Sequence, residues 1–249
     1  MAKWHDAVII DRVDWNPHLF SLYFSCSEFP TFTAGQFAKI GVEMQDGTVI
    51  SRPYSLVNSP QSDVLEVIAV PVEEGSLSPK LHALQKGDKL KIMSPATGFL
   101  VLNEVPASEN LLMLATGTGV GPFLSILETR EPWRTYKNIT LVYGVRKFHD
   151  LAYLAKIEKW QNDHAEQFSF VPVVSREKHA GTIQGRIPAL IKSGVIQNQT
   201  KIDINPENTQ VMLCGNPAMI ADAMQVLNEL GFKKHLRRSP GQISMERYW

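Results

Sequence analysis

The pattern of hydrophobic and polar residues changes character about two fifths of the way along the chain. Before that point, short segments rich in β-branched and aromatic residues are separated by Pro, Gly, Asn and Asp. Apolar and polar residues alternate most clearly at residues 19–25. Regular short strands of this kind predict a small antiparallel barrel. Strands are expected at residues 7–10, 19–25, 37–42, 49–57, 65–70 and 89–93, and a short helix at 77–84.

From residue 108 the pattern predicts strands that alternate with helices. Residues 111–115 are continuously apolar, as in a parallel strand buried on both faces. Such alternation indicates a parallel sheet built from βαβ units. The predicted fold is therefore a β-barrel domain, residues 1–100, followed by an α/β domain, residues 101–249. The second domain is expected to have strands at 111–115, 139–145, 168–174 and 211–214, and helices at 123–130, 151–162, 187–191 and 218–230.

Charge and cysteine content narrow the functional classes. The 249 residues contain 25 basic and 25 acidic side chains, so no global field attracts nucleic acid or an anionic membrane. Acidic residues soon follow the N-terminus, and no apolar run is long enough to span a bilayer. Cys26 and Cys214 are too far apart in sequence to suggest a metal centre or a disulfide framework. We expect a cytoplasmic protein whose redox chemistry, if any, uses an organic cofactor.

A candidate flavin site lies in the fourth predicted strand. Arg52 and Tyr54 share one face of a strand, because side chains alternate between faces. Arg52 could bind a phosphate, Tyr54 could stack on a heterocycle, and Ser55 could hydrogen-bond its edge. These features suit a flavin dinucleotide. An ordinary edge strand, with Pro53 at a position that needs no donor, explains the same residues.

A glycine-rich turn follows the apolar strand 111–115 and leads into a helix. Parallel sheets present backbone N–H groups to a pyrophosphate at such a junction. The spacing differs from the usual G-x-G-x-x-G, so a plain tight turn remains an alternative. The candidate nucleotide-binding residues are Thr116, Gly117, Thr118, Gly119, Gly121 and Pro122.

Together, these two motifs resemble the ferredoxin-NADP(H) reductase family. Residues 214–217, Cys-Gly-Asn-Pro, resemble its cysteine-glycine motif, and residues 75–79 resemble its loop that binds the flavin pyrophosphate. The ending Tyr248-Trp249 is similar to that of the bacterial ferredoxin/flavodoxin reductases. The resemblance covers the whole chain in one order. It implies that Gly75, Leu77 and Ser78 bind FAD.

The resemblance also implies how the flavin is held. Tyr54 would stack on one face of the isoalloxazine, with Arg52 on the pyrophosphate and Ser55 near N5. Tyr248 would cover the other face, where its displacement could gate hydride transfer, and Trp249 would stack on the adenine.

The resemblance implies a catalytic role for Ser55 and Tyr248, and also for Cys214 and Glu246. Cys214 would lie beside the nicotinamide rather than act as a nucleophile, although a buried cysteine is more often a small apolar filler. Glu246 would act near the flavin edge in proton supply. A surface glutamate beside Arg247 is the alternative.

Charge at the predicted strand ends favours NADPH over NADH. Ser175 and Arg176 follow a strand where an NAD-specific site more often has an acid on the ribose. Arg176 and Arg186 offer guanidinium groups for a 2'-phosphate, and Ser175 an added donor. Arg146 matches a third arginine of the family. Solvated surface arginines are the alternative.

The resemblance implies that NADPH reduces FAD by hydride transfer and that single electrons then pass, reversibly, to ferredoxin or flavodoxin. The basic run at residues 233–238 could steer such an acidic carrier, although a solvated loop is the default. Nothing requires more than a monomer. Two alternatives remain: an NADPH-dependent free-flavin or quinone reductase, and a flavin-binding redox sensor that does not turn over.

Overall fold

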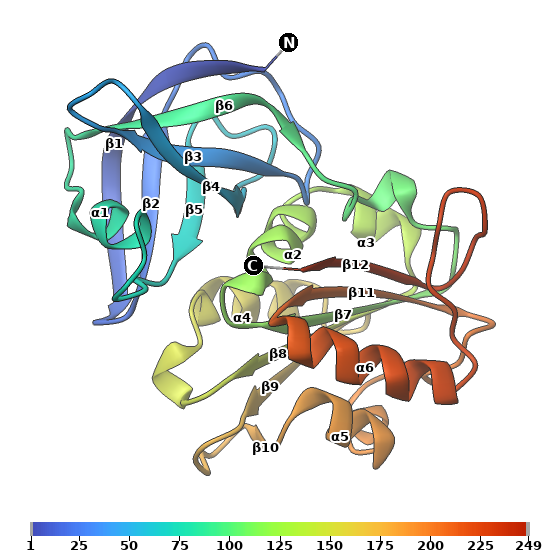
Figure 1. Cartoon of the computed structure of the whole chain (residues 1–249). Coiled ribbons are helices and arrows are strands. Elements are labelled where there is room, and N and C mark those ends of the chain that lie inside the picture. Colours follow the sequence, from blue (N-terminus) through green and yellow to red (C-terminus); the bar gives the residue numbers. More distant parts are fainter. Residues whose placement is uncertain (1, 248–249) are drawn as a thin grey trace. The chain divides into compact units, whose positions relative to one another are not determined.

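The chain folds into two compact units in the computed structural model, which describes residues 2–247. The first unit comprises residues up to 101 together with residues 121–129, and the second comprises the remainder. Each unit has its own sheet (Figure 1). No helix within residues 2–247 is long and apolar enough to cross a membrane. Among the same residues, no three His, Cys, Asp or Glu side chains gather in a way that could hold a metal ion.

The first unit is built on a six-stranded antiparallel sheet with the order β4-β3-β6-β1-β2-β5. The sheet curls so that its two edges meet, and the N–H of Val57, just after β4, donates to the C=O of Glu66 in β5 at 2.9 Å. Fully buried Phe20, Leu22 and Ile40 contribute to the core inside it. The predicted barrel is therefore confirmed. Its elements are β1 (Lys3–Asn16), β2 (Leu19–Ser25), β3 (Phe37–Glu43), β4 (Val49–Ser55), β5 (Leu65–Ala69), α1 (Ser78–Ala83) and β6 (Lys89–Thr97).

Helix α2 (Gly121–Leu127) packs with the barrel although it follows the glycine-rich turn in sequence. The buried Ser125 hydroxyl donates to the C=O of Asn58 at 2.7 Å, and the Glu128 carboxylate accepts from the N–H of Ser59 at 2.6 Å. The sequence-based boundary after residue 100 assigns this helix to the second domain. These hydrogen bonds explain why it belongs to the first compact unit.

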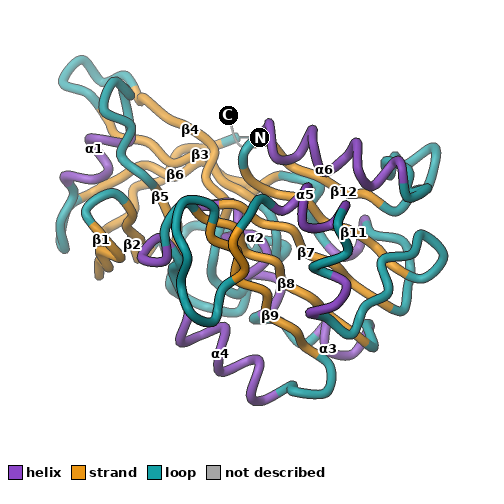
Figure 2. The backbone as a smooth tube through the Cα atoms, turned by 90° about the horizontal axis from the view of Figure 1, so that it is seen from below, coloured by secondary structure: helices purple, strands orange, loops and turns teal. Residues whose placement is uncertain are grey.

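The second unit is a parallel sheet with the order β10-β9-β8-β7-β11-β12. Helices α5 and α6 cover one face and α4 the other (Figure 2). This three-layer arrangement confirms the predicted α/β fold. Its strands are β7 (Asn110–Thr116), β8 (Asn138–Val145), β9 (Phe168–Val174), β10 (Ile183–Gln184), β11 (Thr209–Gly215) and β12 (Ile243–Arg247). Its α-helices are α3 (Glu131–Thr135), α4 (Leu154–Asp163), α5 (Ile187–Lys192) and α6 (Pro217–Glu229), and its short 3-10 turns are η1 (Leu102–Glu104), η2 (Gly117–Val120), η3 (Phe148–Asp150) and η4 (Gln197–Gln199).

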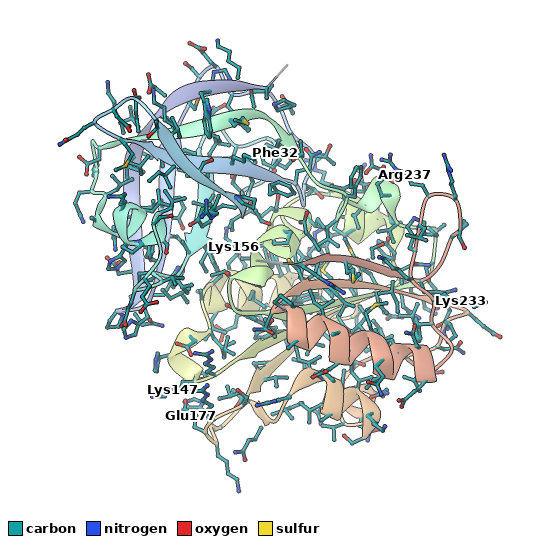
Figure 3. The ribbon with its side chains drawn as sticks, in the orientation of Figure 1. Phe32, Lys147, Lys156, Glu177, Lys233 and Arg237 are labelled. Atoms are coloured by element: carbon teal, nitrogen blue, oxygen red, sulfur yellow. The ribbon has the colours of Figure 1, made fainter. Side chains whose placement is uncertain are left out.

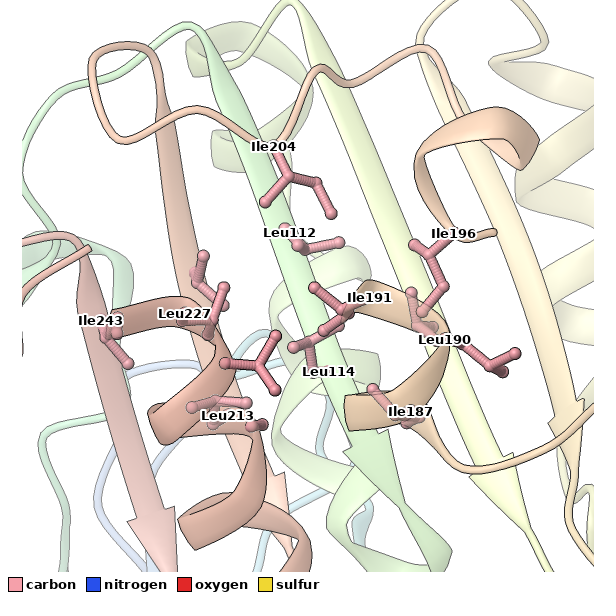
Figure 4. Packing of buried hydrophobic residues seen from close by; sticks show 14 of the residues in the cluster. Leu112, Leu114, Ile187, Leu190, Ile191, Ile196, Ile204, Leu213, Leu227 and Ile243 are labelled. Carbon is pink, nitrogen blue, oxygen red and sulfur yellow. The ribbon is translucent and has the colours of Figure 1, made fainter. Parts of the chain in front are cut away.

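The continuous apolar run at residues 111–115 is explained by burial of both faces of β7. Leu112 and Leu114 point to the face covered by α5 and α6, where they pack with Ile187, Ile191 and Leu213 (Figure 4). Neighbouring positions of β7 point to the opposite face and are equally buried. This packing holds the carboxyl end of β7 in place, where the glycine-rich turn begins.

Two elements differ from the sequence-based expectation. The helix expected at residues 151–162 begins only at Leu154, because Tyr153 has a left-handed backbone with φ of 62°. Strand β1 runs from residue 3 to 16, far beyond the expected residues 7–10. The second half of β1 is polar, so its residue pattern did not predict a strand. Arg12 in this half pairs with Asp14 at 2.6 Å and donates to the C=O of Leu84 at 3.2 Å.

Candidate functional site

The strand order of the second unit reverses between β7 and β11. Strands β7 to β10 follow one another in one direction, whereas β11 and β12 lie on the other side of β7. In open parallel sheets, ligands bind beyond the carboxyl ends of the strands at such a switch point. Thr116 at the end of β7 and Gly215 at the end of β11 both lie there.

The two glycine-containing turns approach each other too closely for side chains. A Cβ on Gly119 would lie 2.6 Å from the carbonyl oxygen of Cys214 and from the Cα of Gly215. Gly215 has a φ of +132°, and a Cβ there would lie 2.2 Å from Oγ1 of Thr116. Both positions therefore require glycine. The Thr116 hydroxyl also accepts a hydrogen bond from the N–H of Asn216 at 3.0 Å, which joins the two turns.

The remaining residues of the predicted turn have distinct places. Gly117 and the buried Thr118 lie in the 3-10 turn η2, and Gly121 and Pro122 are the first residues of α2. A Cβ on Gly121 would approach Val57 at 3.3 Å, so this glycine is a packing position of the first unit. The turn therefore contributes Thr116 to Gly119 to the switch point.

Asn216 has a structural role at this point that the sequence analysis did not assign. Its side-chain oxygen accepts from the N–H of Ala218 at 2.8 Å and so caps helix α6, with Pro217 in the first turn. An Asn before Pro at the start of an apolar-periodic segment is a recognisable helix-start signal. The cap fixes the direction in which the chain leaves Gly215.

Cys214 and Glu246 are direct neighbours across the β11–β12 pair. Cys214 is fully buried, whereas Glu246 is half-buried. Burial raises the pKa of the Glu246 carboxyl to about 7. Its Oε2 is buried and has no hydrogen-bond partner among residues 2–247. Glu246 therefore differs from an ordinary surface glutamate, and Arg247 beside it is the exposed residue. Tyr248 and Trp249 lie outside the described residues.

The three predicted arginines follow three adjacent strands at the same edge. Val145 pairs with Val174, which in turn pairs with Gln184, so Arg146, Arg176 and Arg186 all lie just beyond these ends. All three side chains are exposed. Guanidinium groups in this position can bind a phosphate beyond the sheet.

Ser175, the first residue after β9, hydrogen-bonds to the end of the neighbouring strand β8. Its N–H and its hydroxyl both donate to the C=O of Val145, at 3.0 and 3.2 Å. A hydroxyl has a single proton to donate. Donation to a phosphate therefore requires this hydroxyl to turn away from Val145.

The arginine loops contain a contact that the sequence analysis missed. The rings of Phe148 and His179 are stacked, with centroids 3.5 Å apart and planes at 7°. Phe148 lies two residues after Arg146, and His179 lies three residues after Arg176. The sequence shows an aromatic residue close to each of the two arginines. It does not show that these two residues, 31 positions apart, contact each other.

The predicted flavin residues lie on edge strand β4 of the barrel. In the pairing with β3, Arg52 faces Ile40, Pro53 faces Lys39 and Tyr54 faces Ala38. Arg52 is exposed and donates to the C=O of Ser51 at 2.8 Å, whereas Ser55 is buried.

Tyr54 packs against the barrel core, and its burial raises the pKa of the phenol to about 12. The phenol therefore stays neutral at physiological pH. The strand thus combines a supported aromatic ring with an exposed guanidinium, an arrangement that suits a ligand with a flat ring and a phosphate.

The loop before α1 is shaped by the residues predicted to bind a pyrophosphate. Gly75 donates its N–H to the C=O of Val72 at 2.7 Å, and the Ser78 hydroxyl accepts from the N–H of Val72 at 2.9 Å. Leu77 is buried and packs in the barrel core. These three residues fold the loop, and Ser76 between them is exposed.

Comparison with known proteins gives a consistent result over the full length. The model of the oxidoreductase NAD-binding domain family matches residues 113–225. The flavodoxin/ferredoxin–NADP reductase of Escherichia coli is 45% identical, with all of both chains covered. The ferredoxin–NADP reductase of Azotobacter vinelandii is 33% identical over 94% of this chain and 93% of its own. A crystal structure of a ferredoxin NADP+ reductase from Neisseria gonorrhoeae with bound FAD and NADP is 35% identical, covers 99% of both chains and has a TM-score of 0.92.

Proposed function

The chain belongs to the ferredoxin–NADP reductase family, and from this membership we propose that it transfers electrons, through bound FAD, between NADPH and ferredoxin or flavodoxin. The observation that carries the proposal is the pair of sites on the two units. One is an aromatic and guanidinium site on β4, and the other is a glycine-lined switch point bordered by exposed arginines.

The residues of β4 fit FAD. Tyr54 offers a ring whose underside is supported by the barrel core, and Arg52 offers an exposed guanidinium for the pyrophosphate. Ser55, Pro53 and the loop residues Gly75, Leu77 and Ser78 complete the proposed FAD site. When bound, FAD supplies the conversion between two-electron hydride transfer and one-electron transfer.

The residues of the second unit fit NADP(H). Gly119 and Gly215 allow the two turns to pack against each other at the carboxyl ends of β7 and β11, where a dinucleotide would bind, and Thr116 holds the two turns together. Arg146, Arg176 and Arg186 provide positive charge for a 2'-phosphate. We therefore propose NADPH as the preferred nucleotide.

Cys214 and Glu246 are proposed to act on the reacting groups. Cys214 is fully buried on β11, so its side chain is fixed and suited to positioning the nicotinamide rather than to nucleophilic attack. Glu246 has a pKa of about 7, so near neutral pH its carboxyl can either hold or release a proton. The roles proposed for Tyr248 and Trp249, covering the flavin and stacking on its adenine, fall outside the described residues.

An anaerobic titration of the purified protein with NADPH and then NADH, followed in the visible spectrum, tests the proposal. We expect a yellow protein that is bleached far more readily by NADPH. A colourless protein that binds no added FAD would refute the flavin site. Equal bleaching by both nucleotides would refute the arginine assignment. Turnover with free FMN but with neither ferredoxin nor flavodoxin would favour the free-flavin reductase instead.

A further inference from the structure

The two loops that carry Arg146 and Arg176 are fastened to each other by side chains as well as by main chain. Phe148 is half-buried and stacks face to face on the exposed ring of His179, with ring centroids 3.5 Å apart. The two rings cover each other's faces, and burial of these apolar surfaces stabilises the contact. The contact joins the loop after β8 to the loop after β9.

Glu177 forms a second connection between the same loops. Its Oε1 accepts a hydrogen bond from the N–H of Phe148 at 2.7 Å. The N–H of Arg176 donates to the C=O of Arg146 at 2.9 Å, so the main chains of the two loops also pair. Figure 3 shows Lys147 and Glu177 close together beyond the ends of the two strands. The carboxylate of Glu177 therefore binds the other loop rather than the side chain of Arg176, the residue before it in sequence.

Each loop is also held internally. Nδ1 of His179 lies 2.8 Å from the C=O of Ala180, so Nδ1 carries a proton and donates it. The Thr182 hydroxyl donates to the C=O of His179 at 2.9 Å. In the other loop, the N–H of Lys147 donates to the carboxylate of Asp150 at 3.0 Å. Each of the two stacked rings therefore belongs to a loop that is held by its own hydrogen bonds.

We propose that the Phe148–His179 stack and the Glu177–Phe148 hydrogen bond form a clamp that positions Arg146 and Arg176 for the 2'-phosphate of NADPH. The proposal rests on the proposed function, because it assumes that these arginines bind that phosphate. Exposed arginines lose rotamer and loop freedom on binding, and loops that are ordered beforehand reduce this loss. Phe148, Glu177 and His179 are therefore positioning residues that raise affinity for a 2'-phosphorylated nucleotide.

Binding of 2'-phospho-AMP and of 5'-AMP, measured by isothermal titration calorimetry on the full-length protein, tests the clamp. We expect His179→Ala and Phe148→Ala to weaken 2'-phospho-AMP binding about three- to tenfold, the range that loss of an aromatic pair predicts. Affinity for 5'-AMP should stay unchanged, since that nucleotide lacks the 2'-phosphate. Glu177→Ala should weaken 2'-phospho-AMP binding as well, because it removes the acceptor for the N–H of Phe148. His179→Phe should retain wild-type affinity because it keeps a ring, and Glu177→Gln should do so because it keeps the acceptor oxygen.

The outcomes separate the clamp from the proposed function. If the wild-type protein binds both nucleotides equally, the arginine assignment fails and the clamp fails with it. If the wild type prefers 2'-phospho-AMP but His179→Ala and Phe148→Ala bind it as tightly, only the clamp is refuted. Equal weakening for both nucleotides would also refute it, because the rings would then contact the adenosine directly. His179 is exposed, so its replacement leaves the folded core intact.

Discussion

Glu246 is a half-buried carboxylic acid on β12, held opposite Cys214. Burial disfavours its charged form and raises its pKa from 4.5 to about 7. Between these two values the unfolded chain has released the proton while the folded chain retains it. Raising the pH through this window therefore favours the unfolded state, and the folded protein is least stabilised by this residue above pH 7.

Glu246→Gln should remove this pH-dependent loss of stability, because the amide does not ionise. We expect the variant to melt at the same temperature as the wild type near pH 4, below both pKa values, and at a higher temperature near pH 8. The gain should be about 1–2 kcal/mol, less than the full pKa shift implies, because the half-buried group keeps part of its hydration. Thermal unfolding across this pH range is the measurement. Parallel melting profiles for the two proteins would contradict a raised pKa.

At the scale of single elements, α2 is held by contacts that its position in the sequence does not reveal. The Ser125 hydroxyl is fully buried and donates to the C=O of Asn58. Ser125→Ala would leave that buried carbonyl without its donor, at a cost of about 1–3 kcal/mol. Thr129→Ala is the matched control, because the Thr129 hydroxyl, just after the end of α2, donates only to the nearby C=O of Ile126 in the same segment. Urea unfolding followed by circular dichroism should show the larger loss for Ser125→Ala, and equal losses would disprove the anchoring role.

The sequence predicted best those elements that are buried, because their apolar residues form a recognisable pattern. Residues 168–174 were expected as a strand, and β9 spans the same residues, because apolar and β-branched residues mark a buried strand. The polar half of β1 and the two-residue strand β10 escaped prediction, since each is fixed by pairing with the neighbouring strand, β2 or β9, rather than by its own residue pattern. Likewise, strand order places the arginines at one edge, but it does not reveal that Phe148 stacks on His179.

At the scale of the whole molecule, a net charge of zero means that any acidic partner must recognise a local patch. Residues 233–238 form a basic loop, of which Lys233 and Arg237 are labelled in Figure 3. Arg237 is paired with Glu104 at 2.5 Å, which offsets its charge. Lys234 and Arg238 are exposed, so they are the better positions at which to test steering of a carrier.

The double variant Lys234→Glu/Arg238→Glu should reduce ferredoxin or flavodoxin about tenfold more slowly at low ionic strength, because charge reversal turns attraction of an acidic carrier into repulsion. The difference should shrink as salt is added, since salt screens exposed charges. Reduction of a small neutral quinone by NADPH should not change. The control Lys86→Glu/Lys89→Glu reverses two exposed lysines of the barrel and alters net charge equally. If both double variants slow the carrier alike, net charge rather than the loop steers it; if the quinone rate falls as well, the loop supports catalysis rather than docking.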